Sequence, residues 1–313
     1  MTDNPEEIVD QNLLNDDKDR QIQADVGDSS WGQLIFPSES ESQFKTEEGM
    51  RVVILGSYLL GYLISETLKE LERRNPSRLN VVGLVSDDPA SPDAKISVKR
   101  RIWRMFDEQE VIHLETAIIE SGLVSGIPVY TGAVKTEYFR ELLKKWNPDV
   151  ILVCVFGQIL DEPIINYPQY GIYNFHPADL LAGHGAGPQP FMDLINRDAK
   201  TSKLTVHQLT TQVDSGHILG QSPAVNVRFS DGGLTDNILV LDDKMIQIAD
   251  VMAALLTKTL ILHKERGMKG PINKLDFDRH FNEEIKDWLM QPVSSAKHSE
   301  ELPVPSKYVD YGL

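Results

Sequence analysis

The segment YNFHPADLLAGHGAG, residues 173–187, contains the residue types of this sequence best suited to chemistry. Asn174 and His176 lie two positions apart at the end of a strand-like run, and side chains two apart in a strand point to the same side. An amide N–H can stabilise negative charge that develops on a carbonyl oxygen, and an imidazole can move a proton near neutral pH. The pair therefore suits transfer of an acyl group to an amine.

A third group should orient the imidazole and stabilise its charged form. Asp214, in the turn TTQVDSG between two predicted strands, is the carboxylate best placed to do so, provided that this hairpin folds back over the strand end. The Asn-x-His pair alone has a second interpretation, in which Asn174 satisfies backbone groups and His176 is a hydrogen-bonded core residue. We interpret His207, in the strand before the turn, as a structural pairing residue.

These residues need a scaffold that brings them to one edge. Apolar, β-branched runs predict strands at 51–55, 80–86, 127–130, 149–156 and 171–175, and helical patterns follow at 59–71, 100–122 and 134–146. Strands that alternate with helices and are apolar throughout indicate a parallel sheet covered on both faces. The sequence therefore predicts an α/β fold with a Rossmann-like open, mostly parallel sheet, in which ligands bind at the carboxyl ends of the strands.

The chain divides into three predicted parts. Residues 1–49 are acidic and weakly periodic, so we expect a disordered or loosely docked arm that is dispensable for catalysis, with Trp31, Ile35 and Phe36 able to tether it to the body or to a second subunit. Residues 50–230 form the catalytic domain. Residues 231–313 form a C-terminal extension, with a long helix at about 234–266 and an irregular tail.

The composition of the chain limits the classes of partner that it is expected to bind. The net charge is −16, and residues 1–49 alone hold thirteen Asp or Glu against three Lys or Arg, which argues against nucleic-acid binding. The basic run KRRIWR, 99–104, suits a solvated helix face or a phosphate site. The single cysteine, Cys154, lies in an apolar run, so neither a disulfide nor a thiolate metal cluster is expected. With no leader and no predicted membrane span, the expected address is the cytoplasm.

With these residues in place, the chain resembles the formyltransferase catalytic-domain family, which includes glycinamide ribonucleotide, methionyl-tRNA and nucleotide-sugar N-formyltransferases. Three segments carry the resemblance, in order: PDVILVCVFGQIL, GIYNFHPADL and LTVHQLTTQVDSGHIL. The matching region runs from about Arg51 to Val227. The resemblance implies the formyltransferase fold, and it favours the catalytic interpretation of Asn174, His176 and Asp214.

By this resemblance Asn174, His176 and Asp214 take the catalytic roles, and the donor is 10-formyltetrahydrofolate. No metal is implied. The backbone around five consecutive residues would hold the pterin of the donor: Phe156, Gly157, Gln158, Ile159 and Leu160.

Sequence differences from the family motifs limit the class of formyl acceptor that we expect. The loop after His176 reads PADLLAG in place of the usual Ser-Leu-Leu-Pro, which suits an unusual acceptor or impaired catalysis. The run GSYLLG lacks the phosphate loop of the glycinamide ribonucleotide enzymes, and a long helix follows where methionyl-tRNA enzymes carry a β-barrel. A small amine remains, with a nucleotide-linked amino sugar as precedent. Four side chains are expected to face it: Ser57, Asp179, His184 and Gln189.

Two other functions use the same fold. A formyltetrahydrofolate hydrolase would send water to the formyl carbon with the same three side chains, although residues 1–49 are too short and too polar for the regulatory domain usual in such enzymes. The third hypothesis is a regulatory protein that binds folate without turnover, which the altered PADLLAG loop permits.

Overall fold

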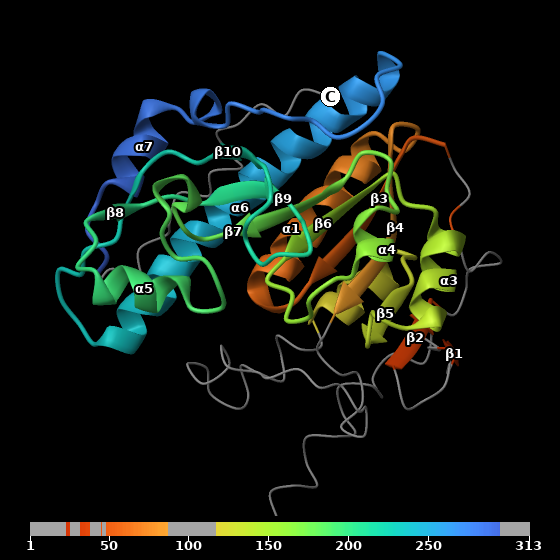
Figure 1. Cartoon of the computed structure of the whole chain (residues 1–313), viewed down its shortest axis with the longest axis horizontal. Coiled ribbons are helices and arrows are strands. Elements are labelled where there is room, and N and C mark those ends of the chain that lie inside the picture. The colour runs from red at the N-terminus through yellow and green to blue at the C-terminus, as the bar shows by residue number, and fades with distance from the viewer. Residues whose placement is uncertain (1–22, 26–31, 38–44, 46–47, 87–116, 295–313) are drawn as a thin grey trace, which may run out of the picture.

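The computed structural model describes residues 23–25, 32–37, 45, 48–86 and 117–294 (Figure 1). The basic run 99–104 and most of the helix predicted over 100–122 lie outside the described residues, as do residues 295–313.

A parallel sheet lies at the centre of the molecule. Its five central strands are β5 (Val129–Gly132), β4 (Leu79–Ser86), β3 (Met50–Gly56), β6 (Val150–Cys154) and β7 (Ile172–His176), and neighbours in that order pair in parallel. β9 (Thr205–Gln208) and β10 (Ile218–Gln221) extend the β7 side antiparallel. The predicted Rossmann-like, mostly parallel core is confirmed.

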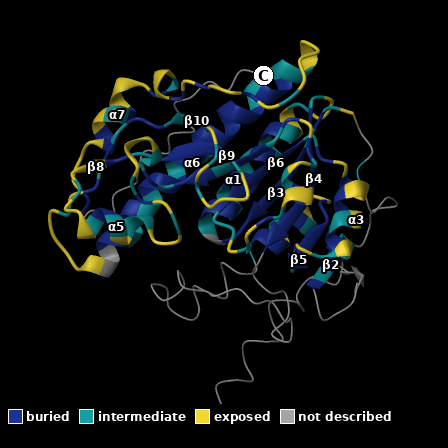
Figure 2. Ribbon diagram, viewed as in Figure 1, coloured by how far each residue is buried: buried dark blue, intermediate teal, exposed yellow. Residues whose placement is uncertain are grey.

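Helices cover both faces, as the apolar strands require. α1 (Tyr58–Arg74), the helical residues 117–124 and α6 (Leu234–Glu265) pack on the face that carries Val52 and Ile54 of β3. α3 (Glu137–Trp146) and α4 (Glu162–Ile165) pack on the other face, against Val53 and Leu55. Both faces of β3 are therefore buried, which explains its uninterrupted apolar sequence (Figure 2).

The glycines of GSYLLG allow β3 and α1 to approach each other. A Cβ on Gly61 would lie 2.7 Å from the backbone carbon of Gly56, closer than real Cβ contacts. The absence of side chains at both positions lets the first turn of the helix pack directly on the strand end. These glycines serve packing in this chain.

The predicted C-terminal helical extension is present. α6 runs diagonally through the molecule beside α1, and it is followed by η4 (Asp278–His280) and α7 (Glu283–Leu289) (Figure 1). By length and composition the segment 237–265 could cross a membrane, contrary to our expectation that no such run exists. Its most apolar window has a mean hydropathy of 1.7, but 72% of that window is buried inside the protein, which is the pattern of a core helix.

Smaller elements complete the structure between β7 and α6. They are η3 (Leu180–Ala182), α5 (Pro190–Asn196), and a separate two-stranded sheet of β8 (Thr201–Ser202) and β11 (Val225–Asn226).

Part of the segment 1–49 is not a loosely docked arm. β2 (Gly32–Phe36) pairs antiparallel with β5, and β1 (Gln23–Asp25) pairs with β2, so both belong to the sheet. Leu34, Ile35 and Phe36 are at most 5% exposed. The acidic composition of the segment concealed a five-residue strand that extends the sheet beyond β5 and buries its apolar side chains.

Candidate active site

β7 and β9 bring an amide and two imidazoles together. Asn174 and His176 lie on the same side of β7, and the antiparallel register places His207 of β9 directly opposite Asn174. Nδ2 of Asn174 lies 3.1 Å from Nε2 of His207, and the rings of His176 and His207 are 6.5 Å apart between centroids. His176 is 7% exposed, and His207 is fully buried.

Asp214 completes the cluster. It lies in the turn between β9 and β10 with a left-handed backbone, φ 50°. One carboxylate oxygen is 3.8 Å from Nε2 of His176 and accepts a hydrogen bond from the backbone N–H of Gly187 at 2.7 Å. The other oxygen is 3.5 Å from Nε2 of His207. The hairpin thus folds back over the end of β7, and residues distant in sequence converge as expected.

Burial and charge set the protonation of the pair. Burial lowers the pKa of His176 below its ordinary value, and the charge of Asp214 and the carbonyl of Gly185 offset this only in part. Burial favours the neutral acid at Asp214, but the nearby imidazoles of His207 and His176 and the N–H of Gly187 together lower its pKa. Near neutral pH the site therefore contains a neutral His176 beside an ionised Asp214.

Hydrogen bonding assigns the protons of the two imidazoles. Nε2 of His176 lies 2.7 Å from the carbonyl oxygen of Gly185, which can only accept, so Nε2 carries the proton and Nδ1 of the neutral ring can accept one. Nδ1 of His207 likewise donates to the carbonyl of Gln208 at 3.0 Å. In its neutral form His207 then accepts at Nε2 from the Asn174 amide, and the second N–H of that amide can donate elsewhere.

His207 is the residue whose place in the site the sequence did not reveal. Its alternation with Thr205 and Leu209 indicated a pairing residue in a strand, which it is. The register between β7 and β9 places Asn174 opposite His207. Neither strand's sequence alone predicts that register.

The predicted donor loop follows β6, next to the end of β7. Val155 begins the loop with φ 52°, a left-handed conformation that is strained for a β-branched residue and persists only where the surroundings enforce it. Gly157 and Ile159 are exposed, while Leu160 is 6% exposed and packs with the α3 face of the core. The backbone from Gly157 to Ile159 therefore lies at the surface, between the start of the loop at Val155 and the buried side chain of Leu160.

Three residues of this loop leave main-chain polar groups available for a ligand. Phe156, Ile159 and Leu160 make no backbone-to-backbone hydrogen bond within the described part of the chain, so their main-chain groups can pair with a ligand. The side chain of Gln158 is bonded to a neighbouring turn of the protein, a role that the expectation for the loop backbone did not include.

The residues expected to face the acceptor are dispersed. Ser57 is fully buried at the β3–α1 junction, so in this structure its side chain does not line an open site. Asp179 caps η3 by accepting from the Ala182 N–H at 3.1 Å and also binds Gln221, which gives it a structural task in the loop. His184 is half-buried, and Gln189 is exposed at the start of α5.

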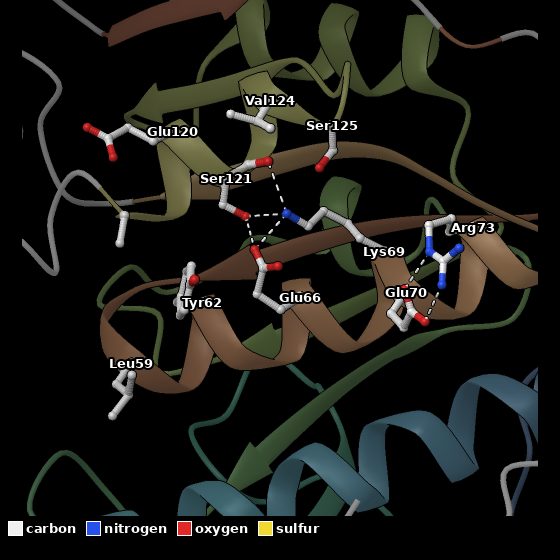
Figure 3. Close-up of a pocket in the computed structure, with 11 residues that line it drawn as sticks. Leu59, Tyr62, Glu66, Lys69, Glu70, Arg73, Glu120, Ser121, Val124 and Ser125 are labelled. Atoms are coloured by element: carbon white, nitrogen blue, oxygen red, sulfur yellow. Dashed lines mark hydrogen bonds and ion pairs between the residues drawn. The ribbon is translucent and has the colours of Figure 1, made fainter. Parts of the chain in front are cut away.

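A separate groove of about 490 Å³ lies between α1 and the helical residues 117–124 (Figure 3). It is on the other face of the sheet from Asn174 and His176 and is not part of this site. Four of its charged side chains form pairs, Lys69 with Glu66 at 2.6 Å and Arg73 with Glu70 at 2.7 Å.

Metal ligands do not cluster in the described part of the chain, where no group of three or more His, Cys, Asp or Glu could hold an ion. Cys154 is buried in the core, and burial raises the pKa of its thiol. The residues suited to acyl transfer that lie together in the described part of the chain are Asn174, His176, His207 and Asp214.

The three segments that carry this geometry match a known family. The model of the formyl transferase family matches residues 50–238. This chain belongs to the formyl transferase family. The family uses 10-formyltetrahydrofolate as its formyl donor. Family membership agrees with the resemblance noted from the sequence, and the matched range holds the whole site and the donor loop.

The chain is also similar to individual formyltransferases. The chain is 32% identical over 165 residues to a methionyl-tRNA formyltransferase of Wolbachia pipientis, covering 52% of this chain and 50% of the relative, and 34% identical over 124 residues to that of Prochlorococcus marinus, covering 38% and 36%. The chain thus spans about half the length, or less, of these relatives. A phosphoribosylglycinamide formyltransferase from Anaplasma phagocytophilum shares the fold, with a TM-score of 0.50 and 17% identity over 70% of this chain and 88% of that one.

Proposed function

We propose that this chain transfers a formyl group from 10-formyltetrahydrofolate to the amine of a small molecule, with a nucleotide-linked amino sugar as the acceptor class. One observation carries the proposal: Asp214 and His207 converge on His176 and Asn174 at the end of β7, beside the donor loop that continues from β6. The folate supplies the activated formyl group.

Each side chain has a task in this reaction. Asn174 holds one amide N–H free to donate to the formyl oxygen, where negative charge develops as the amine adds; such a donor contributes about 10²–10³ in rate. His176 accepts the proton that the attacking nitrogen loses and returns it to the leaving nitrogen. Asp214 stabilises the imidazolium that exists between these two proton transfers.

The acceptor follows from charge and architecture. The curated relatives are named for methionyl-tRNA and the solved structure for phosphoribosylglycinamide, so both are rival acceptors. The net charge of −16 opposes binding of a polyanion such as tRNA. The close packing of Gly56 on Gly61 leaves the first βα turn shaped for helix packing, which argues against a phosphate loop at that position.

The test is an acceptor screen with the full chain. Tetrahydrofolate release from 10-formyltetrahydrofolate would be followed with a nucleotide-linked amino sugar, with glycinamide ribonucleotide, with methionyl-tRNA and without any amine. Release that depends on the amino sugar supports the proposal. Equal release without amine would assign the hydrolase reaction, and folate binding without release would assign a regulatory role. Asn174→Ala and His176→Ala are the controls, since each should lower turnover by about 100-fold or more while folate affinity stays within about twofold.

A further inference from the structure

The side chain of Gln158 ties the donor loop to a turn on a different strand. Its Nε2 donates to the carbonyl oxygen of Gly132 at 2.8 Å, and its Oε1 accepts from the backbone N–H of Val134 at 3.1 Å. The side-chain amide thus donates one hydrogen bond to the turn after β5 and accepts one from it, as a backbone peptide group would. One side chain connects two loops that lie 26 residues apart in the sequence.

The turn that Gln158 binds is held in place by residues of β5 and β2. The hydroxyl of Tyr130 donates to the carbonyl of Ala133 at 2.9 Å, which fixes the turn from the β5 side. Gly32 of β2 pairs with Gly132, and a Cβ at Gly32 would lie 2.4 Å from the carbonyl oxygen of Thr131 and 2.9 Å from the Tyr130 hydroxyl. Only glycine permits this approach of β2 to the turn.

Apolar packing joins the same parts. Leu34 and Phe36 of β2, Val134 of the turn and Leu160 of the donor loop belong to one buried cluster. Polar and apolar contacts therefore link β2 to the donor loop through the turn 132–134. The strain at Val155, where that loop begins, requires such external support.

We infer that Gln158 is a positioning residue for the folate donor loop, and that β2 belongs to the donor site because it builds the turn to which Gln158 is bonded. This inference rests on the proposed function. Backbone groups of residues 156–160 can bind a pterin only while the loop keeps its shape, and the Gln158 side chain holds that shape from inside the protein. Residues 32–36 are therefore required for donor binding, although the composition of residues 1–49 predicted a dispensable arm.

The experiment compares Gln158→Leu, which keeps the volume and removes both hydrogen bonds, with Gln169→Leu, a change at an exposed glutamine on the surface. Binding of 5-formyltetrahydrofolate would be measured by calorimetry, and amide hydrogen exchange would be measured without ligand. For Q158L we expect about tenfold weaker folate binding, equivalent to about 1.4 kcal/mol, because both hydrogen bonds that hold the loop are lost. We also expect faster exchange at Val134 and at 156–160, with an unchanged KM for the amine. Q169L should match the unaltered chain.

The contribution of β2 is tested with Gly32→Ala and, should that variant not fold, with Leu34→Ala. Either change should weaken folate binding in the same direction, and its combination with Q158L should cost less than the sum of the two, because both act through one turn. Folate affinity within twofold of the unaltered chain in Q158L, with unchanged exchange at Val134, would overturn the inference. If the unaltered chain binds no folate, the proposed function fails, and the exchange at 156–160 still decides whether Gln158 holds the loop.

Discussion

Asn174 faces His207 across the β7–β9 ladder, with 3.1 Å between Nδ2 and Nε2. This contact fixes which face of the amide is turned toward the protein and which N–H remains for a substrate. Because Nδ1 of His207 is itself held by the carbonyl of Gln208, the ring cannot turn freely. The orientation of the amide is therefore determined by a histidine in another strand.

The first prediction concerns that histidine. His207→Gln, which cannot reproduce the ring geometry, should lower kcat about 10- to 100-fold by misplacing Asn174, while the KM for folate changes by less than about twofold. Steady-state kinetics with the accepted amine give both constants. His217→Ala is the matched control on the same hairpin, because that ring is exposed, hydrogen-bonds to the carbonyl of Asn273, and should leave kcat unchanged. Equal effects of the two variants would remove His207 from the site.

The second prediction concerns pH. His176 must be neutral to accept a proton, and burial holds its pKa below the ordinary 6.5, so kcat/KM should fall only as pH drops below that value. The negative charge of Asp214 raises the pKa of His176, so Asp214→Asn should lower that pKa and move the acid limb to lower pH. The same change should lower kcat on the order of 10²-fold, since the imidazolium loses its counter-charge. A pH–rate profile with an acid limb that moves upward in D214N would contradict this assignment.

Much of the parallel core could be predicted from sequence because the central strands are buried on both faces. Val52 to Leu55 are all fully buried, and a run of apolar residues between a glycine and a helix pattern identifies such a strand. β2 escaped prediction because its five residues lie in an acidic segment. Asn174 and His176 were identified from their spacing, whereas the partner of Asn174 depended on a strand register that tertiary packing sets.

The roles of loop side chains were the hardest to predict. Asp179 has the residue type of a ligand-binding group, but it caps η3 and binds Gln221. Ser57 stands at the end of β3, where a ligand could be expected, but close packing of α1 buries it. In both cases local structure, a helix cap for Asp179 and close helix packing for Ser57, determines the place of the side chain, and sequence spacing does not distinguish this from ligand binding.

The third prediction concerns the opposite end of the sheet. One carboxylate oxygen of Asp149 accepts from the backbone N–H of Arg51 at 2.8 Å and from the ammonium of Lys264 at 2.5 Å, which ties α6 to the start of β3. Asp149→Ala should lower the free energy of unfolding by about 1–3 kcal/mol, because it removes the acceptor of a partly buried N–H and the counter-charge of Lys264. Asp149→Asn keeps an acceptor for that N–H and should cost about half as much. Urea unfolding measures both, and equal losses in the two variants would show that the charge alone matters.

The fourth prediction concerns Asp250, which accepts a hydrogen bond from Thr67 between α6 and α1. Burial raises the pKa of Asp250 from 3.8 to about 6, an effect that the Thr67 hydroxyl opposes. Because the folded-state pKa lies above the unfolded value, its contribution to stability is complete below about pH 4 and is lost as pH rises through about 6.

Asp250→Asn should therefore remove this pH dependence and raise the free energy of unfolding by on the order of 1–3 kcal/mol at pH 8, since the amide is neutral at every pH and can still accept from Thr67. Thermal unfolding from pH 4 to pH 8 measures the effect. Asp287→Asn, at an exposed position of α7, changes the net charge by the same amount and should leave the pH dependence as it is. A parallel response of the two variants would mean that net charge, and not the burial of Asp250 between α1 and α6, governs stability at high pH.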